Sequence, residues 1–243
     1  MLIEQAAYGN RWRQVCPQAK ACFALAGLVA AFVAVSPGAA LRVAVLSCMV
    51  SCLGAGVPGG LYLRLAAPAS GFLALSCLSL SVAVDSDFTW RWAPDALPEM
   101  AALAGRSLAA LAALLGLVLT TPLTDLIGLL RRLRCPEVLL DLMVLCYRML
   151  FVFSQAVHDT RTAQQARLGD VTTRHGLRSL GRLAAHLAVQ VWQRGHALHL
   201  AALARNGDGA LRFLAPDFAH AGRDTAVAAL AGCLLIALAR WTV

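Results

Sequence analysis

In this 243-residue chain, two short arginine-containing stretches contain the residues whose type and spacing could do chemistry. Each closes a long helical pattern, and a glycine follows each arginine. An arginine in the last turn, followed by a glycine that can adopt positive φ, is typical of a helix end with an exposed cation. Such an arginine can bind a carboxylate with two hydrogen bonds. The repetition leaves two interpretations open. The stretches are either two ordinary helix ends or a pair of docking tips with six contact residues: Ala166, Arg167, Gly169, Ala204, Arg205 and Gly207.

The composition of the chain is that of an integral membrane protein. Hydrophobic residues make up 59% of the sequence, charged residues make up 14%, and the mean hydropathy is +0.68. Soluble domains carry about 25% charged residues. No cleavable leader pattern is recognisable at the N-terminus, so we expect the first apolar run to remain as a membrane anchor.

Five apolar runs predict about five transmembrane helices, because a helix needs roughly 20 apolar residues to cross the hydrocarbon core. The runs are 21–36, 39–57, 65–84, 100–120 and 225–243. Val57-Pro58-Gly59-Gly60 predicts a turn between the second and third runs. The segment 85–99 is acidic and contains two tryptophans, which predicts an external loop at the membrane interface.

The positive charge is concentrated in residues 121–223, which hold 13 of the 21 cations. The positive-inside rule places this region and the N-terminus in the cytoplasm. Nucleic acid is not an expected partner, because no nucleic-acid motif is present. The predicted organisation is a four-span membrane domain (1–120), cytoplasmic coupling helices (121–223) and a C-terminal transmembrane helix (224–243).

The cytoplasmic region is expected to form three helices, two of them long. The first covers 122–134, with Thr121 and Pro122 as its N-cap and first residue; the others cover about 137–168 and 173–205. The second helix begins apolar, although Asp141, Arg148 and Gln155 recur every seven residues. Polar side chains recur every four residues in the third: Arg174, Arg178, Arg182, His186, Gln190 and Arg194.

No catalytic residue, cofactor site or metal site is expected in this chain. The sequence contains no phosphate-binding loop, no nucleophile elbow and no H-E-x-x-H motif. His196 and His199 share a helix face but lack a third ligand nearby, so interfacial or core roles are favoured. The eight cysteines contain no C-x-x-C pair, and most lie in apolar runs as small hydrophobic residues.

Nearly the whole chain resembles the transmembrane T components of energy-coupling factor transporters, most closely the cobalt-type CbiQ group. The resemblance covers Pro17-x-x-Lys20, the acidic loop 85–99, the run from Thr120 through Tyr147-Arg148, and the two arginine tips. The family pattern at the tips is Ala-Arg-Gly. Here Leu168 and Asn206 take the third place, and the glycine comes one residue late.

The resemblance implies a non-catalytic coupling subunit of an ATP-driven importer for cobalt(II) in the bacterial inner membrane. The implied partners are a dimer of CbiO-like ATPases, which bind ATP and magnesium, and a CbiM-like substrate subunit, which binds cobalt. A small CbiN-like membrane subunit and the lipid bilayer complete the set.

Two other readings remain open at this stage. A six-span intramembrane enzyme or secondary carrier would use 138–157 as an extra span, with Asp141 and Arg148 as an ion pair. That span would place the arginine-rich region 161–223 outside, against the charge bias. A conventional permease with one short coupling helix would not need two long cytoplasmic helices.

Overall fold

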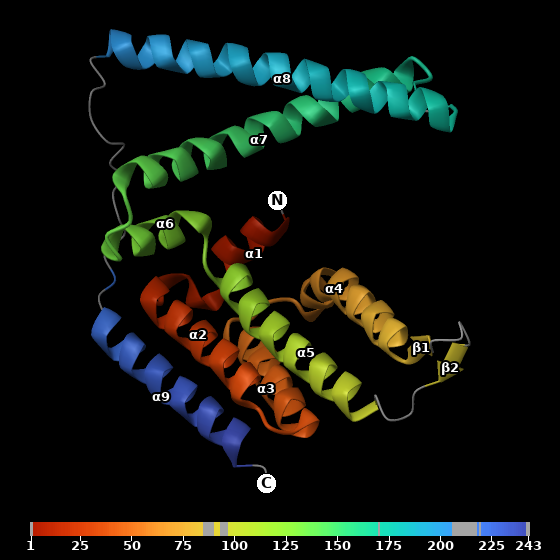
Figure 1. The fold of residues 1–243 in the computed structure, drawn as a ribbon. Helices are drawn as coiled ribbons and strands as arrows, with labels where there is room; N and C mark the ends of the chain where they lie inside the picture. The colour runs from red at the N-terminus through yellow and green to blue at the C-terminus, as the bar shows by residue number, and fades with distance from the viewer. Residues whose placement is uncertain are drawn as a thin grey trace. The chain divides into compact units, whose positions relative to one another are not determined.

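The computed structural model describes residues 2–84, 90–92, 97–169, 171–205, 218 and 220–241. These residues are almost entirely helical, which confirms the all-α membrane fold; the exceptions are two strands of three residues each. The chain divides into two compact units. The first contains Met1–Leu129 and Ala215–Val243, and the second contains Leu130–Leu214. We describe each unit by itself (Figure 1).

The first unit holds the apolar helices. Among the described residues, four segments are long and apolar enough to cross a membrane, and a fifth apolar helix, α2, is shorter. This agrees with the expected five spans. The elements of the unit are α1 (Leu2–Gly9), the 3-10 helix η1 (Arg11–Gln14), α2 (Pro17–Val33), α3 (Pro37–Met49), the π-helix η2 (Val50–Gly54), α4 (Gly59–Leu80), β1 (Val82–Val84), β2 (Trp90–Trp92), α5 (Leu97–Thr120), α6 (Leu123–Arg132, which ends past Leu129) and α9 (Ala221–Arg240).

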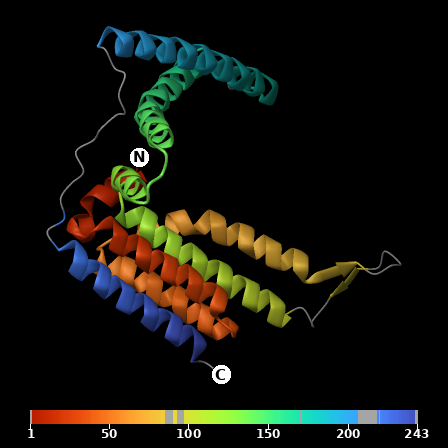
Figure 2. The ribbon, with the colours of Figure 1, turned by 60° about the vertical axis from the view of Figure 1, so that its left-hand side comes forward.

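Helices α2, α3, α5 and α9 lie side by side in one bundle (Figure 2), and a core of small side chains lies between them. The buried members include Ala30, Ala31, Ala34, Ala39, Ala40, Val43, Ala109, Leu235 and Ala239. Small residues let helix backbones approach closely, and close packing drives helix association in lipid. A Cβ at Gly232 would lie 2.5 Å from the Ala26 Cβ, so α9 crosses α2 at almost backbone contact.

Helix α4 begins earlier than the sequence predicted. Pro58 precedes its first residue, and the Pro58 carbonyl accepts from the Leu61 and Tyr62 amides at 3.0 and 3.2 Å. The prediction of a turn at 57–60 is therefore wrong for its second half, because Gly59 and Gly60 already belong to α4. Tyr62 is buried and donates to the Ala112 carbonyl at 3.4 Å, which anchors α4 on α5.

The segment after α4 differs from the expected simple loop. β1 pairs with β2 in an antiparallel hairpin, with Val82 opposite Trp92 and Val84 opposite Trp90. The third apolar run therefore ends as a helix at Leu80 rather than at residue 84. The acidic residues at 85, 87 and 95 lie outside the described residues.

The second unit is a hairpin of two long helices, α7 (Glu137–Ala166) and α8 (Thr173–Ala204). Their lengths of 30 and 32 residues correspond to about 45 and 48 Å at 1.5 Å per residue. Both helices were expected at nearly these bounds. α7 is not among the described helices that are long and apolar enough to cross a membrane.

Candidate functional site

The first predicted tip is the turn that ends α7. Arg167 is the C-cap residue, with φ −98° and ψ 19°. The Leu168 amide donates to the Gln165 carbonyl at 3.0 Å, and the Gly169 amide donates to the Gln164 carbonyl at 2.9 Å. These two bonds form a Schellman motif, which satisfies carbonyls that the helix end leaves free.

Leu168, and not the glycine after it, takes the left-handed conformation at this tip. Its φ is +58°, and it is one of two described non-glycine residues with positive φ. The expectation that Gly169 supplies the positive φ is therefore wrong. The Schellman geometry places the left-handed residue directly after the C-cap, and that place belongs to Leu168. The leucine side chain is 72% exposed, so little packing compensates the strain.

Gly169 is needed for a different reason, which is lack of space. A Cβ at this position would lie 2.9 Å from both the Gln164 carbonyl oxygen and the Ser179 Oγ. Ser179 is buried, and its hydroxyl donates to the Gly169 carbonyl at 3.1 Å. The Gln164 side chain donates to the Ser179 carbonyl at 3.1 Å. These bonds fasten the end of α7 to the first turns of α8.

The start of α8 is capped independently of these contacts. The Thr172 side chain accepts from the His175 amide at 3.3 Å, and its hydroxyl lies 2.7 Å from His175 Nδ1. A threonine N-cap satisfies one of the free amides at a helix start. The turn between α7 and α8 is therefore held from both sides, and it presents Ala166 and Arg167 on an ordered, exposed surface.

The second predicted tip ends α8 with the same backbone conformation. Arg205 is the C-cap residue with φ −99° and ψ 12°, and its amide donates to the Ala202 carbonyl at 3.1 Å. Ala204 and Arg205 are both exposed. Gly207 lies outside the described residues, so its predicted role stays a prediction.

The structure does not bring the two arginines together. Arg167 precedes α8 and Arg205 follows it, so the whole 32-residue helix separates them, a path of about 48 Å (Figure 1). Two exposed cations at that spacing cannot clamp one small ligand.

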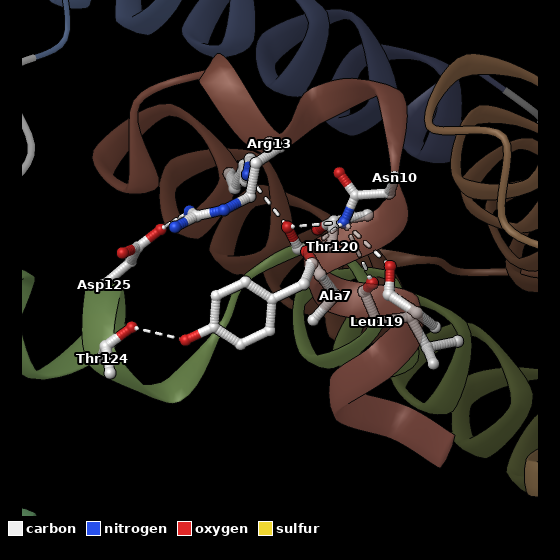
Figure 3. A network of polar contacts seen from close by, with 10 residues as sticks. Ala7, Asn10, Arg13, Leu119, Thr120, Thr124 and Asp125 are labelled. Atoms are coloured by element: carbon white, nitrogen blue, oxygen red, sulfur yellow. Dashed lines mark hydrogen bonds and ion pairs between the residues drawn. The ribbon is translucent and has the colours of Figure 1, made fainter. Parts of the chain in front are cut away.

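A buried polar network in the first unit, shown in Figure 3, was not predicted as a site. The Asn10 side-chain amide donates to the Ala7 carbonyl at 2.8 Å and to the Leu119 and Thr120 carbonyls at 3.3 and 3.1 Å. The Lys20 ammonium, 5% exposed, donates to the same Thr120 carbonyl at 2.9 Å. The N-terminal segment is thereby fixed to the end of α5.

An ion pair extends this network onto α6. Arg13 binds Asp125, whose side chain is 3% exposed, and the Arg13 guanidinium lies 5.0 Å from the centre of the Tyr8 ring. The Tyr8 hydroxyl is 3.3 Å from the Thr124 hydroxyl (Figure 3). The sequence did contain a signal for this network, because Lys20 and the run beginning at Thr120 were both identified as motifs. They were identified separately, and their contact was not predicted.

The predicted start of α6 is off by one residue. The Thr121 amide still donates to the Leu117 carbonyl at 3.0 Å, so Thr121 continues α5, and its hydroxyl has no described partner. The Pro122 carbonyl instead accepts from the Asp125 and Leu126 amides at 3.1 and 3.2 Å. Arg131 and Arg132 lie in the last turn of α6, where cations complement the helix dipole.

Within the described parts of the chain, no three His, Cys, Asp or Glu residues gather to hold a metal ion. The tips offer exposed cations for binding, and the network offers structural rigidity.

Comparison with known proteins gives a consistent result. The family model described as CbiQ, cobalt transport protein, matches residues 9–213. A cobalt transport protein CbiQ of Rhodobacter capsulatus is 36% identical over 87% of this chain and 86% of its own length. An uncharacterized protein of Methanocaldococcus jannaschii is 29% identical over 88% of this chain and 83% of its own length. A putative fused cobalt transport protein CbiMQ of Methanocorpusculum labreanum is 36% identical over 58% of this chain and 23% of its own length.

Proposed function

This chain belongs to the CbiQ family of cobalt transport proteins, and on that basis we propose that it is the coupling subunit of an ATP-driven importer. As a family member it is a multi-pass membrane component of cobalt transport. We propose further that it catalyses nothing itself. It transmits the motion of a partner ATPase dimer, which binds ATP and magnesium, to a separate membrane subunit that binds cobalt(II).

The pair of tips carries the proposal. Arg167 and Arg205 end their helices with nearly the same φ and ψ, both follow an alanine, and both are exposed. An ATPase dimer with two-fold symmetry offers two copies of one groove, and two copies of one tip suit that symmetry. A separation of about one 32-residue helix lets each tip enter a different subunit.

One of the remaining partners has support from a relative. One relative is named as a fusion of CbiM with CbiQ, which supports a CbiM-like substrate subunit as a direct neighbour of this chain. We extend the proposal to a CbiO-like ATPase dimer and a small CbiN-like subunit. The membrane is the bacterial inner membrane, and the α7–α8 hairpin lies on its cytoplasmic side, as the excess of arginine indicates.

Charge reversal at the tips tests this function. The variants Arg167→Glu and Arg205→Glu are co-expressed with the candidate ATPase and substrate subunits, and cellular uptake of radioactive cobalt is measured together with ATPase co-purification. We expect each reversal to reduce uptake at least tenfold, because losing one buried charge pair at an interface costs about 2–5 kcal/mol.

Arg182→Glu is the matched control, since Arg182 is an exposed arginine in the interior of α8, away from both tips. It should leave uptake within about twofold of the original chain, in line with the small cost of exposed charges. Normal uptake by both tip variants, with membrane insertion intact, would refute the assignment.

A further inference from the structure

A cavity inside the first unit is not explained by the coupling function. It has a volume of about 480 Å³, within the range of small-ligand pockets. Its walls come from η1, α2, the α3–η2 region, α5 and α9, and most of them are apolar. Its lining residues on α2 and α9 all precede Ala26 and Gly232, where the two helices approach each other closely.

Polar groups gather at one end of this cavity. Lys20 and Thr120 line it, and Arg223 and Asp224 lie in the first turn of α9. The Lys20 ammonium has three donors, and among the described residues its only hydrogen bond is the one to the Thr120 carbonyl. Two N–H groups of a 95% buried cation therefore remain for a ligand.

A second buried polar group in the wall also lacks a partner. Ser47 is 1% exposed, lines the cavity, and its hydroxyl makes no hydrogen bond within the described structure. Buried polar groups are nearly always hydrogen-bonded, so an unpartnered one indicates a missing ligand or solvent molecule. Ser47 and Lys20 together point to an occupant that accepts hydrogen bonds.

The cavity reaches the surface along α9. Arg223 and Val227 line it and are both exposed. On α9 the lining runs from Arg223 to Ala231, about 12 Å of helix, and past the polar end it consists of alanine and valine. An elongated apolar cavity that opens from a membrane-embedded bundle is in contact with acyl chains.

We propose that this cavity binds one acidic phospholipid, with its phosphate at Lys20 and Arg223 and an acyl chain along α9. The two cations outweigh the single carboxylate of Asp224, so an acidic headgroup is preferred over a zwitterionic one. The lipid occupies a place in the bundle that no helix of the chain fills. This inference needs the membrane fold but not the proposed coupling role.

Native mass spectrometry of the purified full chain tests the proposal. The detergent-solubilised protein is incubated with equal amounts of phosphatidylglycerol and phosphatidylcholine of the same chain length. We expect one retained phospholipid per chain, with phosphatidylglycerol favoured at least fivefold. Absence of a retained lipid, or equal retention of the two lipids, would overturn the proposal.

Two variants locate the lipid. The double change Ala228→Leu, Ala231→Leu fills the cavity from α9 and should reduce retention about tenfold. The control change Ala226→Leu, Ala229→Leu alters exposed residues of α9 that do not line the cavity, and should retain the lipid. Equal retention by the filled and control variants would contradict the assignment.

Arg223→Gln provides a test that leaves the bundle packing unchanged, since Arg223 is exposed at the cavity mouth. It should weaken the retention of phosphatidylglycerol more than that of phosphatidylcholine, so that the fivefold preference is lost. An unchanged preference would contradict the placement of the phosphate. Cross-linking of an Ala228→Cys variant to a co-expressed membrane subunit, in place of lipid retention, would show a protein occupant and overturn the proposal.

Discussion

Replacing Leu168 by glycine and by alanine measures the strain stored at the first tip. Both changes remove the same exposed leucine side chain, so they differ mainly in the backbone. The φ of +58° at this position is unfavourable for any residue with a Cβ, and glycine adopts it without that penalty. We therefore expect the glycine variant to have the more stable turn, although glycine usually destabilises structure.

The expected difference follows from two opposing effects. The left-handed conformation costs a non-glycine residue about 1–2 kcal/mol. Glycine makes the unfolded chain more flexible, which costs about 0.4–1 kcal/mol on folding. The turn should therefore be more stable in Leu168→Gly than in Leu168→Ala by about 0.5–1 kcal/mol. This difference is a factor of about two to five in the opening equilibrium of the turn.

Hydrogen exchange of the Gly169 amide reports this equilibrium, because that amide donates to the Gln164 carbonyl across the turn. Protection of Gly169 should be about two- to fivefold greater in Leu168→Gly than in Leu168→Ala. Leu180 is an exposed residue inside α8, and its substitutions by glycine and alanine are the matched pair. There the order should be reversed, with the alanine variant locally more stable by about 1 kcal/mol. Equal protection in the two Leu168 variants, or greater protection with alanine, would refute the strain argument.

Three further outcomes follow from other contacts. Gly169→Ala places a Cβ 2.9 Å from two oxygens and should destabilise the turn by about 1–3 kcal/mol, seen as faster limited proteolysis there. Gly176→Ala, which meets nothing within 4 Å in α8, should instead stabilise the helix by about 1 kcal/mol. Asp125→Asn should lower the free energy of unfolding in detergent by about 3 kcal/mol, and Arg13→Gln by about 1 kcal/mol. The buried Asp125 carboxylate lies near two cations, whereas the Arg13 side chain is one-third exposed. Thermal unfolding measures this order, and an equal fall in Tm for the two variants would contradict it. A reporter enzyme fused after Gly207 should be active on the cytoplasmic side, and activity on the outer side would favour the six-span alternative.

The sequence was most informative where composition alone determines structure. Apolar runs of about 20 residues located the membrane helices within a few residues, since length and hydropathy decide whether a helix can span a bilayer. The two long helices of the hairpin were equally evident, because Pro136 and the turn around Gly169 interrupt an otherwise helical pattern. The small-residue core could be identified only from the structure, because the sequence does not distinguish an alanine that faces another helix from one that faces lipid.

The details of the candidate site depend on contacts between distant residues. The left-handed conformation of Leu168 could not be predicted from a pattern in which glycine normally takes that place. The requirement for Gly169 comes from Ser179, which lies ten residues further along the chain. Likewise, Lys20 and Asn10 meet the Thr120 carbonyl across at least 100 residues of sequence, a pairing that no local spacing indicates.

The packing of the first transmembrane helix on the last has a consequence for biosynthesis. Within the described structure, α2 makes its most extensive helix contact with α9, and the 85-residue unit from Leu130 to Leu214 is synthesised between them. A nascent chain that leaves the ribosome must therefore hold α2 in the bilayer without its principal neighbour until translation is nearly complete. A truncation before Ala221 removes that neighbour, so it leaves the alanine face of α2 open to degradation by membrane proteases.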